Sequence, residues 1–109
     1  MPRPDSLHGT LDLLVLKVLL RLGSLHGYAI MTAIQERSRD VLRVEEGSLY
    51  PALHRMEEAG WIRAAWVTRD TGRRQRLYEL TAVGRRELEA AQTRWRSAAS
   101  AINRVLRTV

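Results

Sequence analysis

The sequence has no cysteine in its 109 residues, and it also lacks any long apolar run. The absence of cysteine excludes disulfide bonds, thiolate zinc sites and cysteine nucleophiles together, which fits an intracellular protein. The most apolar stretch contains Asp12 and Lys17 and ends at Gly23, so we expect no membrane segment. The N-terminal residues lack the apolar core of a secretion signal, and we therefore expect a cytoplasmic location.

The residue patterns of common enzymes are missing as well. His8, His26 and His54 are scattered, without the HExxH spacing of a zinc site, and neither a GxSxG elbow nor a phosphate-binding glycine loop occurs. The acidic pairs at 45–46 and 57–58 consist of adjacent side chains, which diverge on a helix or loop and therefore favour solvated charges or helix caps. We expect no enzymatic activity, no metal site and no cofactor.

Lysine is nearly absent, and the basic residues are almost all arginine. The chain has 18 basic residues, of which only Lys17 is lysine, and 12 acidic residues, so the formal net charge is +6. The planar guanidinium of arginine can pair with phosphate or guanine through two hydrogen bonds, so this balance favours a polyanionic partner such as nucleic acid. A GC-rich genome also favours arginine codons. The positions of the arginines in the fold have to decide between these explanations.

The first part of the chain predicts three helices. Apolar residues recur at helical spacing from Thr10 to Leu22, and a Gly-Ser break separates this helix from a second one over 26–38. A third helix is predicted over about 47–59 and ends before Gly60. Its buried stripe is Leu49, Leu53 and Met56. The second helix is expected to bury Tyr28 or Ala29, together with Ile30, Ala33 and Ile34.

The residue pattern changes after the third helix. Residues 61–68 and 75–81 carry β-branched or aromatic residues with roughly alternating polarity, and the turn-forming Gly72 lies between them. This pattern predicts a two-stranded hairpin. Because an isolated hairpin is marginally stable in water, it should lie against the helices through alternate residues. The candidates for that buried face are Ile62, Trp66, Tyr78 and Leu80.

A heptad repeat predicts one long helix from Thr81 to the end of the chain. Large apolar residues at one heptad position are interleaved with smaller residues at another, which is typical of a helix that pairs with a second helix. The large residues are Leu88, Trp95, Ile102 and Val109, and the interleaved ones are Ala91, Ala98 and Val105. We expect a homodimer whose interface contains Leu11, Leu88, Ala91, Trp95, Ala98, Ile102 and Val105.

The order of these elements is that of a winged helix-turn-helix protein. We therefore expect a mainly α fold with a small β-hairpin, divided into a winged helix-turn-helix DNA-binding domain over 1–81 and a long C-terminal dimerisation helix over 82–109. In such folds the third helix enters the major groove, while the hairpin, or wing, reaches the backbone or an adjacent groove. The charge agrees, because residues 61–76 include five arginines and one acidic residue.

DNA contacts are expected on the outer face of the third helix and in the wing, over about 69–76. Glutamates near the end of the helix would be repelled by phosphate, so its N-terminal half should dock. His54 equally fits a half-exposed packing residue, and Tyr50 equally fits a core ring whose hydroxyl alone reaches solvent. The expected DNA-binding residues are Ser48, Tyr50, His54, Arg55, Arg69, Thr71, Gly72, Arg73, Arg74 and Arg76.

Five motifs in a fixed order cover nearly the whole chain: GTLDLLVLKVL, HGYAI, EEGSLYPALHRMEEAGWI, GRRQRLYELT and LTAVGRREL. In this combination the chain resembles the PadR-type transcriptional regulators of bacteria, especially the short members with a single helix after the wing. The resemblance implies a homodimer that binds palindromic promoter DNA, usually as a repressor, and it implies roles in DNA binding for Tyr50, Arg73 and Arg74. The chain departs from many relatives at Gln75-Arg76, where they have a lysine beside an aromatic residue. The resemblance therefore implies that the wing as a whole binds phosphate, rather than any particular contact within it.

Trp95 is a candidate ligand residue. In some members of that family an aromatic residue in the equivalent stretch lines a cavity at the dimer interface, where planar compounds stack. The resemblance therefore implies a planar small-molecule effector as a candidate partner. A tryptophan at a heptad position also packs simply against a partner helix. The small residues Ala91, Ala98 and Ala99 either leave space beside the ring or let the two helices approach closely.

Together these patterns predict a sequence-specific transcriptional regulator that binds a palindromic site as a homodimer and can respond to a ligand. Two alternatives from other classes stay open. Winged helices also serve as protein-interaction modules, and the basic surface would then meet an acidic partner. The main activity could also be the binding of a small molecule at the dimer interface.

Overall fold

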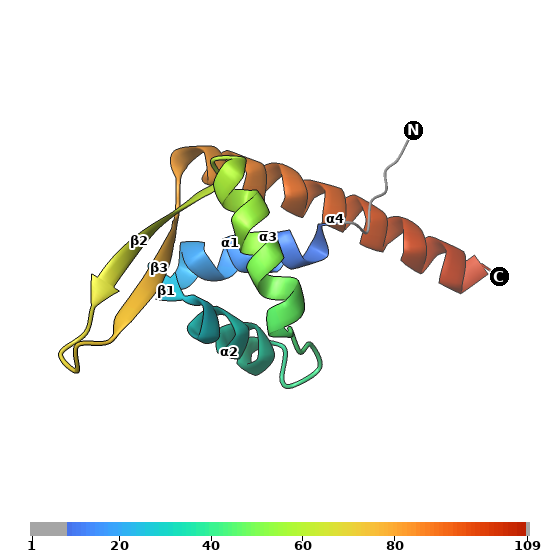
Figure 1. Cartoon of the computed structure of the whole chain (residues 1–109). Helices are drawn as coiled ribbons and strands as arrows, with labels where there is room; N and C mark the ends of the chain where they lie inside the picture. The colour runs from blue at the N-terminus through green and yellow to red at the C-terminus, as the bar shows by residue number, and fades with distance from the viewer. Residues whose placement is uncertain (1–8, 109) are drawn as a thin grey trace.

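The computed structural model describes residues 9–108, and within them the expected fold class is confirmed (Figure 1). Residues 1–8 of the expected first domain and the expected seam residue Val109 lie outside the described part. The elements are α1 (Thr10–Leu22), β1 (Leu25–His26), α2 (Gly27–Arg37), α3 (Glu46–Glu58), β2 (Ile62–Thr68), β3 (Arg74–Leu80) and α4 (Ala82–Thr108).

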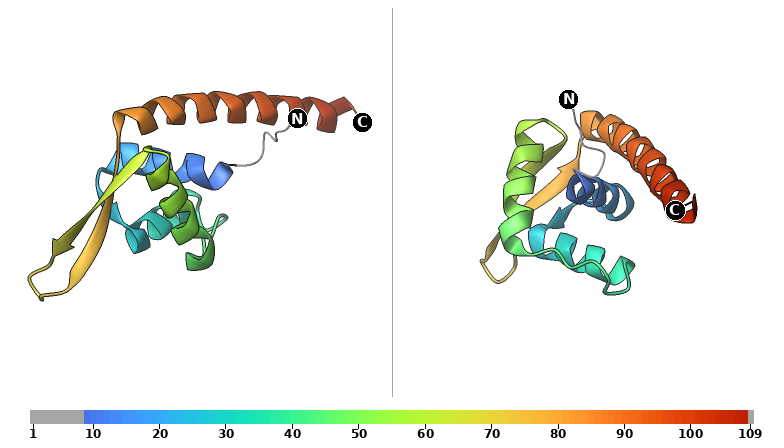
Figure 2. Two further views of the ribbon diagram at one scale, coloured as in Figure 1. Left: turned by 45° about the horizontal axis from the view of Figure 1, so that its top comes forward. Right: turned by 90° about the vertical axis from the view of Figure 1, so that its right-hand side faces the viewer.

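Helix α1 lies at the centre of the molecule, with α2, α3 and α4 arranged around it (Figure 2). Its apolar residues extend around most of its circumference, which suits a helix with several neighbours. The core also contains the predicted stripe of α3, where Leu49, Leu53 and Met56 are at most 1% exposed. Full burial of each such side chain contributes about 1.5–3 kcal/mol of transfer free energy. The burial of this stripe fixes which face of α3 turns outward.

Strands β2 and β3 form the predicted hairpin, paired from Ile62↔Leu80 to Thr68↔Arg74. The turn is closed by a hydrogen bond from Gly72 N to the Arg69 carbonyl (2.8 Å), and Gly72 has a φ of +84°, a region that favours glycine. A third strand, β1, pairs with β3 and was not predicted. Its two residues are too few to show the alternation by which a strand is recognised.

The expected buried face of the hairpin is only partly correct. Ile62 and Tyr78 are buried and Leu80 is half-buried, whereas 56% of Trp66 is exposed. Alternation along β2 does place Trp66 on the same face as Ile62. Figure 1 shows the hairpin extending beyond the helices, and Trp66 belongs to its exposed outer part, residues 65–74. The prediction that Trp66 packs against the helices is therefore wrong.

A compact joint connects the hairpin to α4. The Thr81 hydroxyl donates to the Gly60 carbonyl at 2.6 Å and accepts from Gly84 N at 3.0 Å, so it caps the helix start. Gly84 lies directly against the Trp61 backbone, because a Cβ built at Gly84 would be 1.9 Å from the Trp61 carbonyl oxygen. The end of α3 and the start of α4 are therefore fastened at one place.

Helix α4 packs on α1 with its first half and then projects away from the core (Figure 1). Leu88 was expected at a dimer interface, but it is 2% exposed and belongs to the chain's own core. This prediction is corrected, since a partner could not reach it. Farther along, Trp95, Ile102 and Val105 are 40%, 41% and 58% exposed. Within residues 9–108, no helix has the length and apolar character needed to cross a membrane.

The joint makes a stability prediction. Gly84→Ala should lower the free energy of unfolding by about 1–3 kcal/mol, because the new methyl group would overlap rigid backbone rather than a movable side chain. Gly47→Ala in α3 is the matched control, since a Cβ there meets nothing within 4 Å. Urea unfolding at a fixed protein concentration measures both variants. Equal stability of the two variants would contradict the proposed close contact.

Candidate nucleic-acid interface

A groove of about 440 Å³ lies between the start of α2, helix α3 and the hairpin. We call it the wing groove. Its floor and walls combine aromatic rings with guanidinium groups and the backbone at a helix start, a mixture suited to an anionic chain with sugar and base surfaces. It is lined by His26, Gly27, Tyr28, Tyr50, Trp66, Arg73, Arg74, Gln75, Arg76 and Tyr78.

The start of α2 forms one end of the wing groove. His26 caps the helix, because its Nδ1 atom accepts a hydrogen bond from Ala29 N at 3.3 Å. The first turn of a helix carries unpaired N–H groups and the positive end of the helix dipole, so it attracts anions. Tyr28 is 67% exposed beside this helix start, while Ala29 is half-buried. The alternative in which Tyr28 is buried is therefore wrong.

Tyr50 of α3 lies directly against the start of α2. A Cβ built at Gly27 would be 2.5 Å from the Tyr50 hydroxyl oxygen and under 3 Å from two ring carbons, so a larger residue at this position would displace the Tyr50 ring. Tyr50 remains 42% exposed. Its ring therefore connects two helices while part of its surface faces the wing groove.

Tyr78 of β3 is a buried residue that also lines the wing groove. Burial raises the pKa of its hydroxyl above the usual value, Arg76 acts in the opposite direction, and the neighbouring Glu57 and Tyr50 raise it further. Tyr78 is therefore neutral over the physiological pH range. A neutral hydroxyl can donate a hydrogen bond and does not repel an anion.

Comparison with known proteins identifies the fold's family. The model of the transcriptional regulator PadR-like family matches residues 15–90, well over half of the chain. The chain belongs to this family. A solved transcriptional regulator from Clostridium thermocellum is 26% identical, with a TM-score of 0.82 over 93% of this chain and 97% of that one. A PadR family regulator from Clostridium difficile is 32% identical, with a TM-score of 0.73 over 90% of this chain and 99% of that one.

One structural relative of this PadR-like chain was solved with a nucleic acid. Bacillus subtilis PadR in complex with operator DNA is 28% identical and has a TM-score of 0.66. The similarity covers 73% of this chain and 46% of that protein's chain. The resemblance inferred from the sequence motifs is confirmed at the level of the PadR family.

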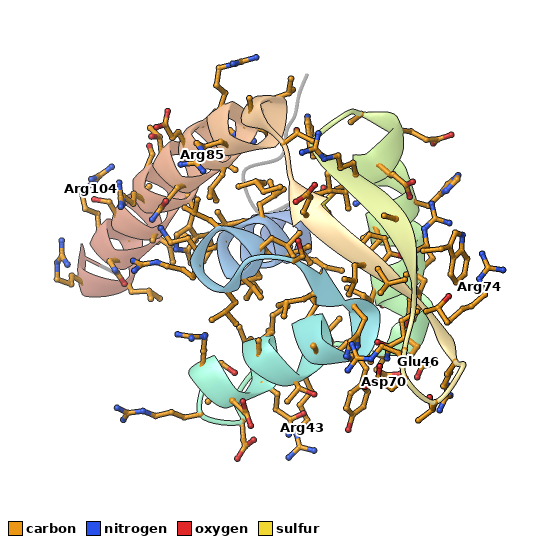
Figure 3. The ribbon with its side chains drawn as sticks, turned by 90° about the vertical axis from the view of Figure 1, so that its left-hand side faces the viewer. Arg43, Glu46, Asp70, Arg74, Arg85 and Arg104 are labelled. Carbon is orange, nitrogen blue, oxygen red and sulfur yellow. The ribbon has the colours of Figure 1, made fainter. Side chains whose placement is uncertain are left out.

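The structure brings together only some of the sequence-predicted site residues. Tyr50, Arg73, Arg74 and Arg76 all line the wing groove, and the exposed turn residues 69–72 continue from it. Figure 3 shows Arg74 on the side of the molecule opposite to the α4 arginines that it labels.

Other predicted residues face elsewhere or are engaged within the chain. Arg55 pairs with Asp12 of α1 at 2.8 Å and lines a separate cavity between α1, α3 and α4. His54 lies 3.5 Å from Glu58 on the exposed surface of α3, and Ser48 lines a depression beside the start of α1. Only part of α3's outer face therefore opens onto the wing groove.

Sequence reasoning missed the contribution of the α2 start. His26, Gly27 and Tyr28 were assigned to a helix but not to a site, and Trp66 was assigned to packing. The HGY triplet was a usable signal, because a histidine cap followed by glycine marks a helix start that a neighbouring ring can approach closely. The position of Trp66 could not be inferred, since the alternation in β2 does not show where the helical core ends.

The contact between Tyr50 and Gly27 can be tested by a double-mutant cycle. Gly27→Ala should cost about 0.5–1.5 kcal/mol of unfolding free energy in the parent chain, less than Gly84→Ala, because the methyl group displaces the movable Tyr50 ring rather than rigid backbone. In a Tyr50→Ala background the space is free, and the same change should be neutral or stabilising. Urea unfolding gives the four free energies. An identical cost in both backgrounds would rule out the direct contact.

Proposed function

We propose that this PadR-family chain binds duplex DNA at a palindromic promoter site as a homodimer and acts as a repressor. The wing groove is the observation that supports DNA binding most directly, since it joins a helix start, Tyr50 and the exposed arginines Arg73 and Arg74. The complex of Bacillus subtilis PadR with operator DNA supports the same partner.

The distribution of charge suggests different roles in DNA binding for α3, on one side, and for the start of α2 and the wing, on the other. Helix α3 begins at Glu46 and ends at Glu58, and its one arginine, Arg55, is paired with Asp12. Phosphate attraction therefore comes mainly from the start of α2 and from the wing. Helix α3 enters the major groove with its N-terminal half, where its side chains read base edges.

The proposed dimer uses the part of α4 that projects beyond the core. Trp95, Ile102 and Val105 form an exposed apolar stripe there. Ala91 and Ala98 of the same helix are half-buried. Leu11 of α1 is also half-buried and extends this surface. A second copy related by a two-fold axis would cover the stripe and present two copies of α3 to successive half-sites.

Trp95 is the proposed point of contact for a planar effector at this interface. A ligand that stacks on its exposed ring would change DNA binding only if it preferred one arrangement of the two subunits. Simple packing of Trp95 against the partner helix is the competing role. We also propose a cytoplasmic location, as promoter binding requires in a bacterium.

Sequence preference tests the proposed function. The chain should bind the region upstream of its own gene at least about 10³-fold more tightly than random duplex at physiological salt. Mobility-shift titration measures this ratio. A protein-interaction module would show no preference among duplexes, so equal affinity for all of them would overturn the proposal.

The salt dependence of binding tests the wing. Arg73→Ala combined with Arg74→Ala should weaken binding to all duplexes and reduce the slope of log K against log salt by about 3.6, because each of the two subunits loses two phosphate contacts and each contact contributes about 0.9. Arg85→Ala with Arg86→Ala removes the same charge from exposed positions of α4 and is the matched control. Equal slopes for the two double variants would show that the wing does not bind phosphate.

A further inference from the structure

Four side chains form a continuous chain of contacts from the end of α3 to the wing. Arg76 Nη2 donates to Glu57 Oε2 at 2.6 Å. The guanidinium carbon of Arg76 lies 5.6 Å from the ring centroid of Trp66, and that of Arg74 lies 4.6 Å from it. Both distances are within the range of cation–π attraction.

We infer that Trp66 and Glu57 are positioning residues that set the wing at a fixed place relative to α3. In this arrangement Arg76 has a structural role, because it connects β3 to α3, and Arg74 is the arginine that binds DNA phosphate. The inference rests on the proposed function, which it deepens by separating two arginines of the same strand.

The strand register explains why one tryptophan can hold both arginines. Trp66 stands directly opposite Arg76, and Arg74, two residues back along β3, is its diagonal neighbour on the same face. Long side chains reach across such diagonal positions. The two arginines are therefore the side chains that contact the face of Trp66, although 56% of this residue remains exposed.

Arg76 forms an ion pair with Glu57 in addition to its contact with Trp66, whereas Arg74 has the contact with Trp66. The charge of Arg76 is balanced by Glu57 at 2.6 Å, and its Nε is shielded from solvent without a hydrogen-bond partner among the described residues. The face of Trp66 is the electron-rich surface that this guanidinium approaches. Reaching a phosphate would require Arg76 to leave both partners, whereas Arg74 is exposed and only needs to move from the face of the Trp66 ring.

The position of this contact chain along the hairpin makes it consequential. Every residue from Ala65 to Arg74 is exposed, whereas Tyr78 is buried. The outer part of the hairpin, residues 65–74, therefore has no apolar core of its own. An unsupported two-stranded hairpin is marginally stable in water. The ion pair of Arg76 with Glu57 therefore ties this part of the hairpin to α3, and the contact of Arg76 with Trp66 joins β3 to β2 at the same level.

Substitutions by uncharged glutamine distinguish the roles of the two arginines. Arg74→Gln should reduce the salt slope of DNA binding by the dimer by about 1.8, as expected for one lost phosphate contact in each subunit, whereas Arg76→Gln should leave the slope unchanged. Glu57→Gln should make the slope steeper by about 1.8, because in each subunit Arg76 is released from its carboxylate and can reach a phosphate. General damage to the fold would not steepen the slope.

The role of the Trp66 ring is tested by a matched pair of variants. Trp66→Phe keeps an aromatic face and should retain most of the slope, whereas Trp66→Leu keeps an apolar side chain without that face and should reduce the slope by up to about 1.8. A readout without DNA is the NMR shift of the Arg74 and Arg76 Nε–H protons. The ring current of Trp66 should displace both shifts, and Trp66→Leu should abolish that displacement.

The outcomes distinguish this inference from the proposed function. If the parent chain shows no preference among duplexes, the proposed function fails, while the NMR shifts still report whether the contact chain exists. If the parent chain binds its site but Arg74→Gln and Arg76→Gln lower the slope equally, the structural role inferred for Arg76 is contradicted. Equal slopes and equal shifts for Trp66→Phe and Trp66→Leu would contradict the positioning role of the ring.

Discussion

The burial of one face of α3 is the constraint on which the proposed DNA interface depends. Leu49, Leu53 and Met56 are packed against α1 and α2, so α3 cannot rotate without exposing them to water. That packing turns Tyr50 toward the start of α2 and opens the wing groove beside it. The hairpin completes the groove, and its position depends in turn on where α3 ends.

Helix α4 is tied to the same constraint through the joint at Thr81. Because the Thr81 hydroxyl donates a hydrogen bond to the Gly60 carbonyl just beyond α3, the direction of α4 is set relative to α3 and the wing groove. The contact of Gly84 with the Trp61 backbone leaves little room for adjustment. In the proposed dimer, a change in how two α4 helices cross would therefore change the spacing of the two α3 helices.

The elements could be predicted from the sequence because their signals are local. The stripe of α3, the turn at Gly72 and the start of α4 all follow from residue spacing over a few turns or strand positions. Leu88 was misassigned for the same reason. A heptad pattern shows that a residue faces an apolar neighbour, but it does not show whether that neighbour is α1 of the same chain or a partner.

The chemistry of the site was less predictable because ion pairs join distant parts of the chain. Arg55 and Asp12 are separated by 43 residues, and Arg76 and Glu57 by 19. A count of arginines in the wing therefore overstates the charge that is free to meet phosphate. The tertiary fold decides which guanidinium groups are already paired, and periodicity carries no information on this pairing.

Hydroxyl-radical footprinting of the chain on its own promoter region tests the central claim most directly. If α3 and the wing of two subunits dock together, two protected stretches should appear, related by a dyad and centred about one helical turn apart or slightly more. Each stretch should extend beyond the bases read by α3 to the phosphates reached by the wing. A single protected stretch without dyad symmetry, or uniform weak protection along the duplex, would contradict the account.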